Sequence, residues 1–197
     1  MASLREQKKL ETRHRLAVAA AELLVAEGDE GATVAAIAER AGVATRTFHN
    51  YFAHREDAFL LFIEEQVTDW AEQIDAADPG TPPLQVLHRI FSDSYRQPQE
   101  SLTTPTNLVL VGEHTKLLLS QESRISASEL ITPLYEAVQR RLPGSTRIQV
   151  RVLVDLCLAA GVSVLQHLGQ SVEANPGAQV EALDEAFGLL ERGLGDT

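Results

Sequence analysis

Apolar residues recur along this chain at the i, i+3, i+4 and i+7 spacing of helices, and its second half shows no strand-like alternation. The segment 12–27 predicts a first helix with one apolar face, formed by Leu16, Ala20, Leu23 and Leu24. From Arg55 to about Ala77 the pattern predicts a helix about 30 Å long. Further helices are predicted at residues 84–95, 106–120, 125–142, 146–168 and 178–192. Pro133 is expected to kink the helix at 125–142 or to restart it from a Thr132 cap, and the last helix is expected to open with Asn175 as N-cap and Pro176 at its first position. The chain is therefore predicted to be all-α.

Segment 33–52 predicts two short helices joined by a tight turn. The first helix has a narrow apolar stripe, formed by Val34, Ile37, Ala38 and Ala41. Thr33 can cap its start, and Gly42 can end it because glycine adopts the left-handed backbone conformation without a Cβ clash. The inner face of the second helix is formed by Phe48, Tyr51 and Phe52. Arg46 and Asn50 then point most nearly outward, with Thr45, Thr47 and His49 on the flanks.

A helix, a glycine turn and a second helix with a polar outer face form the arrangement that fits the major groove of DNA. Two ordinary bundle helices joined by Ala-Gly-Val are the alternative, because isolated patterns of this kind are common. The context favours DNA, since one amphipathic helix precedes the pair and a long helix follows. By side-chain chemistry, Arg46 is expected to contact guanine, and Asn50 adenine or a phosphate. Thr45 and Thr47 are expected to contact thymine methyl groups or the backbone.

The residues that follow this pair, YFAHREDAF, match the pattern Y-F-x-x-[KR]-E-[DN]-[AL]-[FL]. With the three predicted helices and a length of 197 residues, they make the chain resemble the TetR family of transcriptional regulators. The motif spans roughly residues 12–60, and the remainder matches the family only in length and helical pattern. The resemblance implies phosphate contacts at four positions, which are Thr33, His49, Tyr51 and Arg55.

The sequence departs from the family pattern at two places. Ala44 stands where the family usually has a Ser or Thr cap, which should weaken the start of the second helix by about 1 kcal/mol unless Thr45 takes over. His49-Asn50 replaces the common Tyr-Tyr or Tyr-Trp. The operator sequence therefore cannot be transferred from better-known relatives.

The predicted helix at 146–168 is apolar over most of its circumference and has small residues in its middle, at Ala159, Ala160, Gly161 and Ser163. It must be covered on more than one side, either as the centre of a monomeric core or by a second copy of itself. The resemblance implies the second arrangement, a homodimer through a four-helix bundle of the last two helices of each subunit. Such a dimer suits an inverted-repeat operator, because its two recognition helices lie about one turn of DNA apart.

By the same resemblance, helices between Arg55 and Leu168 enclose a pocket for a small-molecule effector, expected to be hydrophobic. The candidate lining residues combine an apolar body with a polar or π-rich surface: Trp70, His88, Phe91, Tyr95, Asn107, His114 and Tyr135. Each is equally consistent with an ordinary core or surface role. The expected domains are a basic flexible arm (1–11), a helix-turn-helix domain (12–54), and an effector-binding and dimerisation domain (55–197).

The net charge of −11 argues at first against nucleic acid as a partner. However, residues 1–60 are nearly balanced, at −1, and the remaining residues carry −10. The first fifteen residues are net +3 and serve either as a solubilising tail or as a phosphate-contacting arm.

Catalytic and metal-binding motifs are absent from the sequence, which has no Gly-x-Ser-x-Gly, no phosphate-binding glycine loop, no His-Glu-x-x-His and no Cys-x-x-Cys. We therefore expect no enzyme activity and no cofactor. Cys157, the single cysteine, is expected to be buried and inert. With no apolar run of 18 residues and no leader segment, a cytoplasmic protein without membrane contact is expected. The sequence predicts a homodimeric repressor; the alternatives are a DNA-packaging protein, disfavoured by the acidity, and an oligomeric ligand-binding module without DNA.

Overall fold

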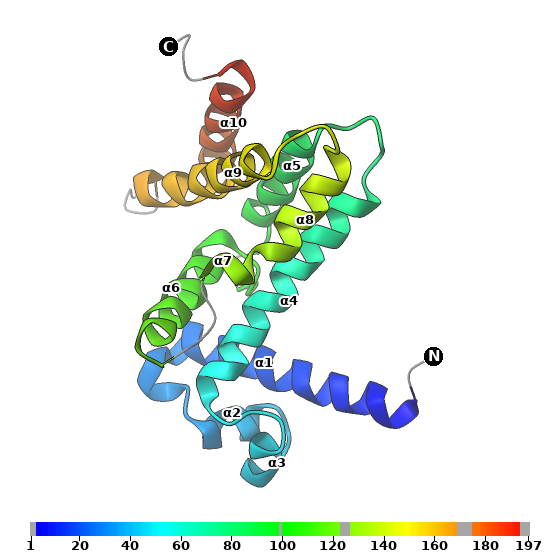
Figure 1. The fold of residues 1–197 in the computed structure, drawn as a ribbon. Coiled ribbons are helices and arrows are strands. Elements are labelled where there is room, and N and C mark those ends of the chain that lie inside the picture. The colour runs from blue at the N-terminus through cyan, green and yellow to red at the C-terminus, as the bar shows by residue number, and fades with distance from the viewer. Residues whose placement is uncertain (1–2, 99, 123–126, 169–174, 194–197) are drawn as a thin grey trace. The chain divides into compact units, whose positions relative to one another are not determined.

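A computed structural model describes residues 3–98, 100–122, 127–168 and 175–193 of the chain (Figure 1). Within these ranges the secondary structure is helical, without strands, which confirms the all-α prediction. The helices are α1 (Leu4–Gly31), α2 (Val34–Arg40), α3 (Thr45–His49), α4 (Arg55–Ala76), α5 (Pro83–Tyr95), α6 (Pro105–Glu122), α7 (Ala127–Leu130), α8 (Thr132–Arg141), α9 (Arg147–Leu168) and α10 (Pro176–Arg192).

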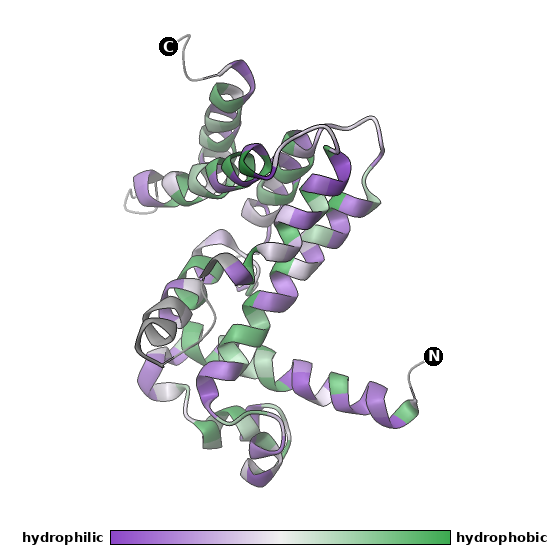
Figure 2. Cartoon of the chain, viewed as in Figure 1, coloured by the Kyte–Doolittle hydropathy of each residue, from purple (hydrophilic) through white to green (hydrophobic). Residues whose placement is uncertain are grey.

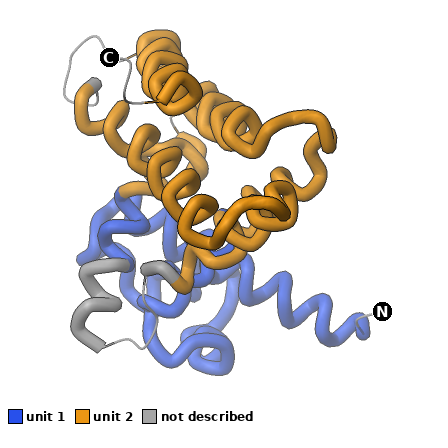
Figure 3. The backbone as a smooth tube through the Cα atoms, turned by 45° about the horizontal axis from the view of Figure 1, so that its top comes forward, with its two compact units in different colours: residues 1–66, 110–127 blue, residues 67–109, 128–197 orange. Residues whose placement is uncertain are grey.

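Two compact units make up the chain (Figure 3). Unit 1 contains residues 1–66 and 110–127, and unit 2 contains residues 67–109 and 128–197. The division falls inside the long helices α4 and α6, and after the first residue of α7. Each of the two long helices therefore contributes to both units.

Unit 1 has α1, α2 and α3 around a small core. The four residues predicted to face inward on α1 are buried, as are Ile37, Phe48 and Phe59 on the helices that follow. Helix α1 begins at Leu4, eight residues before the predicted start, so residues 4–11 are helical and not a flexible arm. The physical reason is a capping box, in which the Ser3 backbone N–H donates to Glu6 (2.7 Å) and the Ser3 hydroxyl accepts from the Glu6 N–H (3.3 Å).

Unit 2 has a core of aliphatic and aromatic side chains from α5, α8, α9 and α10, among them Leu87, Leu134, Val154 and Leu183. Helix α4 ends in this unit, where Arg141 donates to the backbone carbonyls of Ile74, Ala77, Asp78 and Thr81. These bonds hold the last turn of α4 and the loop that follows it. Asn175 caps α10 and Pro176 is its first residue, as predicted.

The helix predicted at 125–142 is two helices, α7 and α8. The second begins at Thr132 with Pro133 in its first turn, and its N-cap residue is Ile131 and not Thr132. Proline tolerates the first turn of a helix because the N–H that it lacks has no intrahelical partner there. Residues 123–126, which the prediction included, lie outside the described residues.

Candidate nucleic-acid interface

Helix α2 and the turn after it are fixed by local hydrogen bonds. The Thr33 hydroxyl accepts from the Ala36 N–H at 3.2 Å, which confirms the predicted N-cap. Gly42 has a φ of 68°, as the left-handed turn requires. The Val43 N–H donates to the Ala38 carbonyl (2.9 Å) and the Gly42 N–H to the Glu39 carbonyl (3.0 Å). This pair of bonds is a Schellman motif, and it sets the direction in which α3 leaves α2.

Helix α3 is held by aromatic packing. Phe48 and Phe52 are buried, with ring centroids 5.5 Å apart. The guanidinium of Arg13 on α1 lies 5.6 Å from the Phe52 ring centre. The N-cap residue Ala44 provides no side-chain hydrogen bond, and Thr45 does not take over that role. Packing of the Phe48 and Phe52 rings therefore stabilises α3, whose first turn has no side-chain cap.

The outer face of α3 presents the side chains predicted to meet DNA. Thr45, Arg46, His49 and Asn50 are exposed, whereas Thr47 and Tyr51 are half-buried. Thr33, at the start of α2, is exposed as well. Within the described part of the chain, Arg46 forms no hydrogen bond or ion pair, so its five N–H donors are free to bind a partner.

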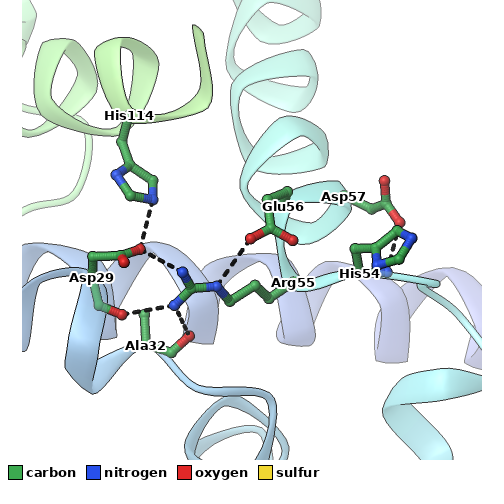
Figure 4. Close-up of polar contacts among 7 residues, drawn as sticks. All are labelled: Asp29, Ala32, His54, Arg55, Glu56, Asp57 and His114. Carbon is green, nitrogen blue, oxygen red and sulfur yellow. Dashed lines mark hydrogen bonds and ion pairs between the residues drawn. The ribbon is translucent and has the colours of Figure 1, made fainter. Parts of the chain in front are cut away.

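Arg55, predicted to contact a DNA phosphate, forms hydrogen bonds within unit 1 (Figure 4). Its guanidinium donates to the Asp29 carboxylate (2.6 Å), to the backbone carbonyls of Asp29 (2.7 Å) and Ala32 (3.2 Å), and to Glu56 (3.0 Å). These bonds use most of its N–H donors and leave the side chain 23% exposed. Neighbouring carboxylates and hydrogen bonds raise the pKa of Arg55 against the opposing effect of burial. Arg55 therefore joins the start of α4 to the turn before α2.

His114 also approaches Asp29 (Figure 4). Its Nε2 lies 3.0 Å from Asp29 Oδ1, at an angle poorer than that of a hydrogen bond, and its ring stacks edge-to-face on Phe59 at 5.3 Å. All these residues belong to unit 1, whereas the other predicted effector residues belong to unit 2. Asp29 was not predicted as a functional residue. The sequence gives little signal for it, since acidic residues are common in exposed turns.

In unit 2, three predicted effector residues lie together. The Trp70 and Phe91 rings are 5.5 Å apart, and Phe91 and His88 both contact the Phe187 ring, at 6.1 and 4.8 Å. His88 Nε2 also pairs with Asp184 at 2.7 Å. Phe187 is the member of this cluster that the sequence analysis missed.

The remaining effector candidates in unit 2 form internal hydrogen bonds. Buried Tyr95 donates to the Gly161 carbonyl at 2.8 Å, and burial raises its pKa to about 12. Asn107 donates to the Ser101 carbonyl at 2.9 Å, and Tyr135 donates to the Asp155 carboxylate. Among the described residues no group of three His, Cys, Asp or Glu side chains could hold a metal ion.

Comparisons with known proteins agree with this geometry. The family described as bacterial regulatory proteins, tetR family, matches residues 16–60. The chain is also 35% identical over 88 residues to the HTH-type transcriptional regulator TcmR of Streptomyces glaucescens, a match that covers 45% of this chain and 39% of that protein. The segment 16–60 therefore belongs to the TetR family. TetR-family proteins are transcriptional regulators, and the matched segment holds α2, α3 and the Arg55 contacts.

Solved structures share the fold of this chain over most of its length. FadR from Bacillus halodurans superposes with a TM-score of 0.61 at 16% identity, covering 90% of this chain and 93% of that one. FadR from Thermus thermophilus, a repressor solved with lauroyl-CoA, has a TM-score of 0.59 at 23% identity, with 92% and 94% coverage. At these identities the likeness extends to the fold alone.

Proposed function

We propose that this TetR-family chain is a sequence-specific DNA-binding repressor, acting as a homodimer on an inverted-repeat operator and released by a small-molecule effector. The observation that carries the proposal is the outer face of α3, where polar side chains are exposed on a helix whose inner face and preceding turn are fixed. In this proposal residues 12–54 are the DNA-binding part. Residues 55–197 bind the effector and the second subunit.

The side chains of α3 suggest separate roles at the DNA. Arg46, unpaired and exposed, has the donor geometry for guanine O6 and N7, and Asn50 can bind adenine or a phosphate. Thr45 and Thr47 can contact thymine methyl groups or the backbone. Thr33, His49 and Tyr51 are assigned to phosphates. Arg55 is assigned a positioning role, because its donors are engaged within the protein.

Helix α9 supports the homodimer. Among the described residues, one helix, at residues 147–167, is by length and composition long and apolar enough to cross a membrane. Yet the helix buries Val154 and Cys157 in unit 2, and Asp155 would be a charge in the middle of the span. Its uncovered stripe includes Ile148 (64% exposed), Val152 (47%) and Leu156 (38%). A second copy of the same stripe would cover this apolar surface through an isologous contact.

The effector is proposed to bind near the cluster of Trp70, His88, Phe91 and Phe187 in unit 2, where aromatic faces favour a hydrophobic ligand. Helices α4 and α6 each contribute to both units, so a ligand that moves either helix can change unit 1. Release requires that the effector prefer the geometry that does not bind DNA, with a coupling of about 1–3 kcal/mol. Acyl-CoAs belong in the test panel, since the Thermus thermophilus structure holds lauroyl-CoA.

Arg46→Ala tests the DNA assignment. A duplex selected by the wild-type protein from a random library serves as the operator, and a scrambled duplex of the same composition as the reference. Arg46→Ala should weaken operator binding by about 1–3 kcal/mol and relax the preference at one base pair per half-site. Arg89→Ala, which removes an exposed charge on α5, is the matched control. It should change neither the affinity for the operator nor the base preference.

Two outcomes would count against the proposal. Equal losses on both duplexes would refute the base contact of Arg46. If the wild-type protein selected no sequence at all while still binding hydrophobic ligands, the chain would be an oligomeric ligand-binding module without DNA.

A further inference from the structure

A groove of about 620 Å³ runs between the first turns of α1 and the far end of α3. Its lining consists of Leu4, Arg5, Lys8, Lys9 and Thr12 from α1, and of Thr47, Asn50 and Tyr51 from α3 and the turn after it. One wall is therefore basic. The other wall belongs to the surface proposed to meet DNA.

The basic wall is one face of α1. Arg5, Lys8, Lys9 and Thr12 are spaced three and four residues apart, so they share one face when the segment is helical. The capping box between Ser3 and Glu6 is what makes it helical from Leu4 onward. Figure 2 shows these first turns as predominantly hydrophilic. The helix thus holds three positive charges beside α3 at fixed positions, which a flexible tail would not do.

The chemistry of the lining selects an extended polyanion. Among the described residues that line the groove there is no carboxylate, although the whole chain carries −11. Opposite the cations stand a hydroxyl, an amide and a phenol, which can donate to phosphate oxygens. Arg5 and Lys9 are separated by one turn, about 6 Å along the axis. That spacing is close to the distance between neighbouring phosphates of one strand, so two of the cations can contact successive phosphates.

We infer that this groove holds the sugar–phosphate backbone of the strand beside the bases that α3 contacts, so that the start of α1 is a second DNA-contacting element. The inference rests on the proposed DNA-binding function and deepens it. Arg5, Lys8 and Lys9 bind phosphates, and Thr47 and Tyr51 face the same backbone from the other wall. The groove provides affinity and fixes register, whereas Arg46 provides sequence preference.

The test compares the salt dependence of DNA binding for wild type and Lys8→Gln/Lys9→Gln, on the selected duplex and its scrambled reference. Each phosphate contact contributes about 0.9 to the slope of log K against log salt. The slope should therefore fall by about 1.8 per bound subunit. At 0.1 M salt the affinity should drop roughly eightfold for each lost contact, equally on both duplexes.

A face-swapped variant separates position from net charge. Adding Gln7→Lys and Leu10→Lys to the double variant restores the total charge on the opposite face of α1, where Leu10 is already exposed. This variant should remain as weak as the double variant. Circular dichroism and the melting temperature should be unchanged for both, because lysine and glutamine have similar helix propensities.

The outcomes distinguish the two proposals. If wild type prefers its selected duplex and Lys8→Gln/Lys9→Gln leaves affinity and slope unchanged, the groove does not hold the backbone, while the DNA-binding function stands. Full recovery in the face-swapped variant would also overturn the inference, because charge alone would then suffice. If wild type shows no sequence preference, the proposed function itself fails.

Discussion

Arg55→Ala distinguishes two interpretations of one residue. The sequence pattern assigns Arg55 to a DNA phosphate, whereas in the structure its guanidinium joins α4 to the turn before α2. A phosphate contact can be removed without affecting the folded protein. A residue that holds the DNA-binding helices in place cannot be removed without loss of stability.

The expected loss follows from the four bonds. The carboxylates contribute little, because Asp29 is 51% exposed and Glu56 is 34% exposed, and ion pairs of such groups are worth about 0–1 kcal/mol. The bonds to the Asp29 and Ala32 carbonyls are charge-assisted, at about 1.5 kcal/mol each at the lower end of the usual range. In the variant, water can bind the two carbonyls and recovers part of this free energy. We therefore expect the free energy of unfolding to fall by about 2–3 kcal/mol.

Urea denaturation at a fixed protein concentration measures the stability, and titrations at several salt concentrations measure the DNA slope. Arg55→Ala should lower stability and affinity while leaving the slope unchanged. Arg40→Ala is the control, since Arg40 pairs only with the half-exposed Glu22 and Glu27 and should lose less than about 1 kcal/mol. Wild-type stability together with a slope lower by about 0.9 would refute the positioning role and restore the phosphate contact.

Three further predictions concern stability and reactivity. Ala44→Ser should raise the free energy of unfolding by about 0.5–1 kcal/mol in urea melts by supplying the missing cap of α3, and no change would mean that the N–H groups there are already satisfied. Tyr95→Phe should lower it by about 0.5–1.5 kcal/mol because the bond to the Gly161 carbonyl is lost; an unaltered urea midpoint would contradict that value. Cys157 should not react with a disulfide reagent at pH 8 until the protein is denatured, since it is fully buried and burial raises its pKa to about 12; rapid labelling of the native protein would show that the site opens.

Local signals predicted the parts of the fold that depend on neighbouring residues. Thr33 caps α2, Gly42 takes a positive φ and Asn175 with Pro176 opens α10, all determined by residues within one turn. The first turns of α1 were missed, although Ser3 and Glu6 have the spacing of a capping box. The run of basic residues has the composition of a flexible arm, but the local capping signal determines its structure.

The contacts of Asp29 could not be predicted in the same way. Its partners are 26 residues away at Arg55 and 85 away at His114, and neither spacing has a local signature. His114 was assigned to the effector because a histidine within an apolar helix suits a ligand site equally well. The chemistry of these side chains is readable from the sequence, but their partners depend on which helices pack together.

The magnitudes of the Asp29 contacts bear on how an effector could release DNA. The His114–Asp29 contact pairs a half-exposed carboxylate with an imidazole at a poor angle. Breaking this contact alone therefore changes the free energy of the protein by about 0–1 kcal/mol. That is at or below the 1–3 kcal/mol that allosteric coupling usually requires. The carbonyl bonds of Arg55 have the required size, and Arg55 is the first residue of α4, a helix that continues into unit 2. For the effector release that we propose, the contacts at the start of α4 are therefore the ones of matching size, and His114 would contribute a minor part.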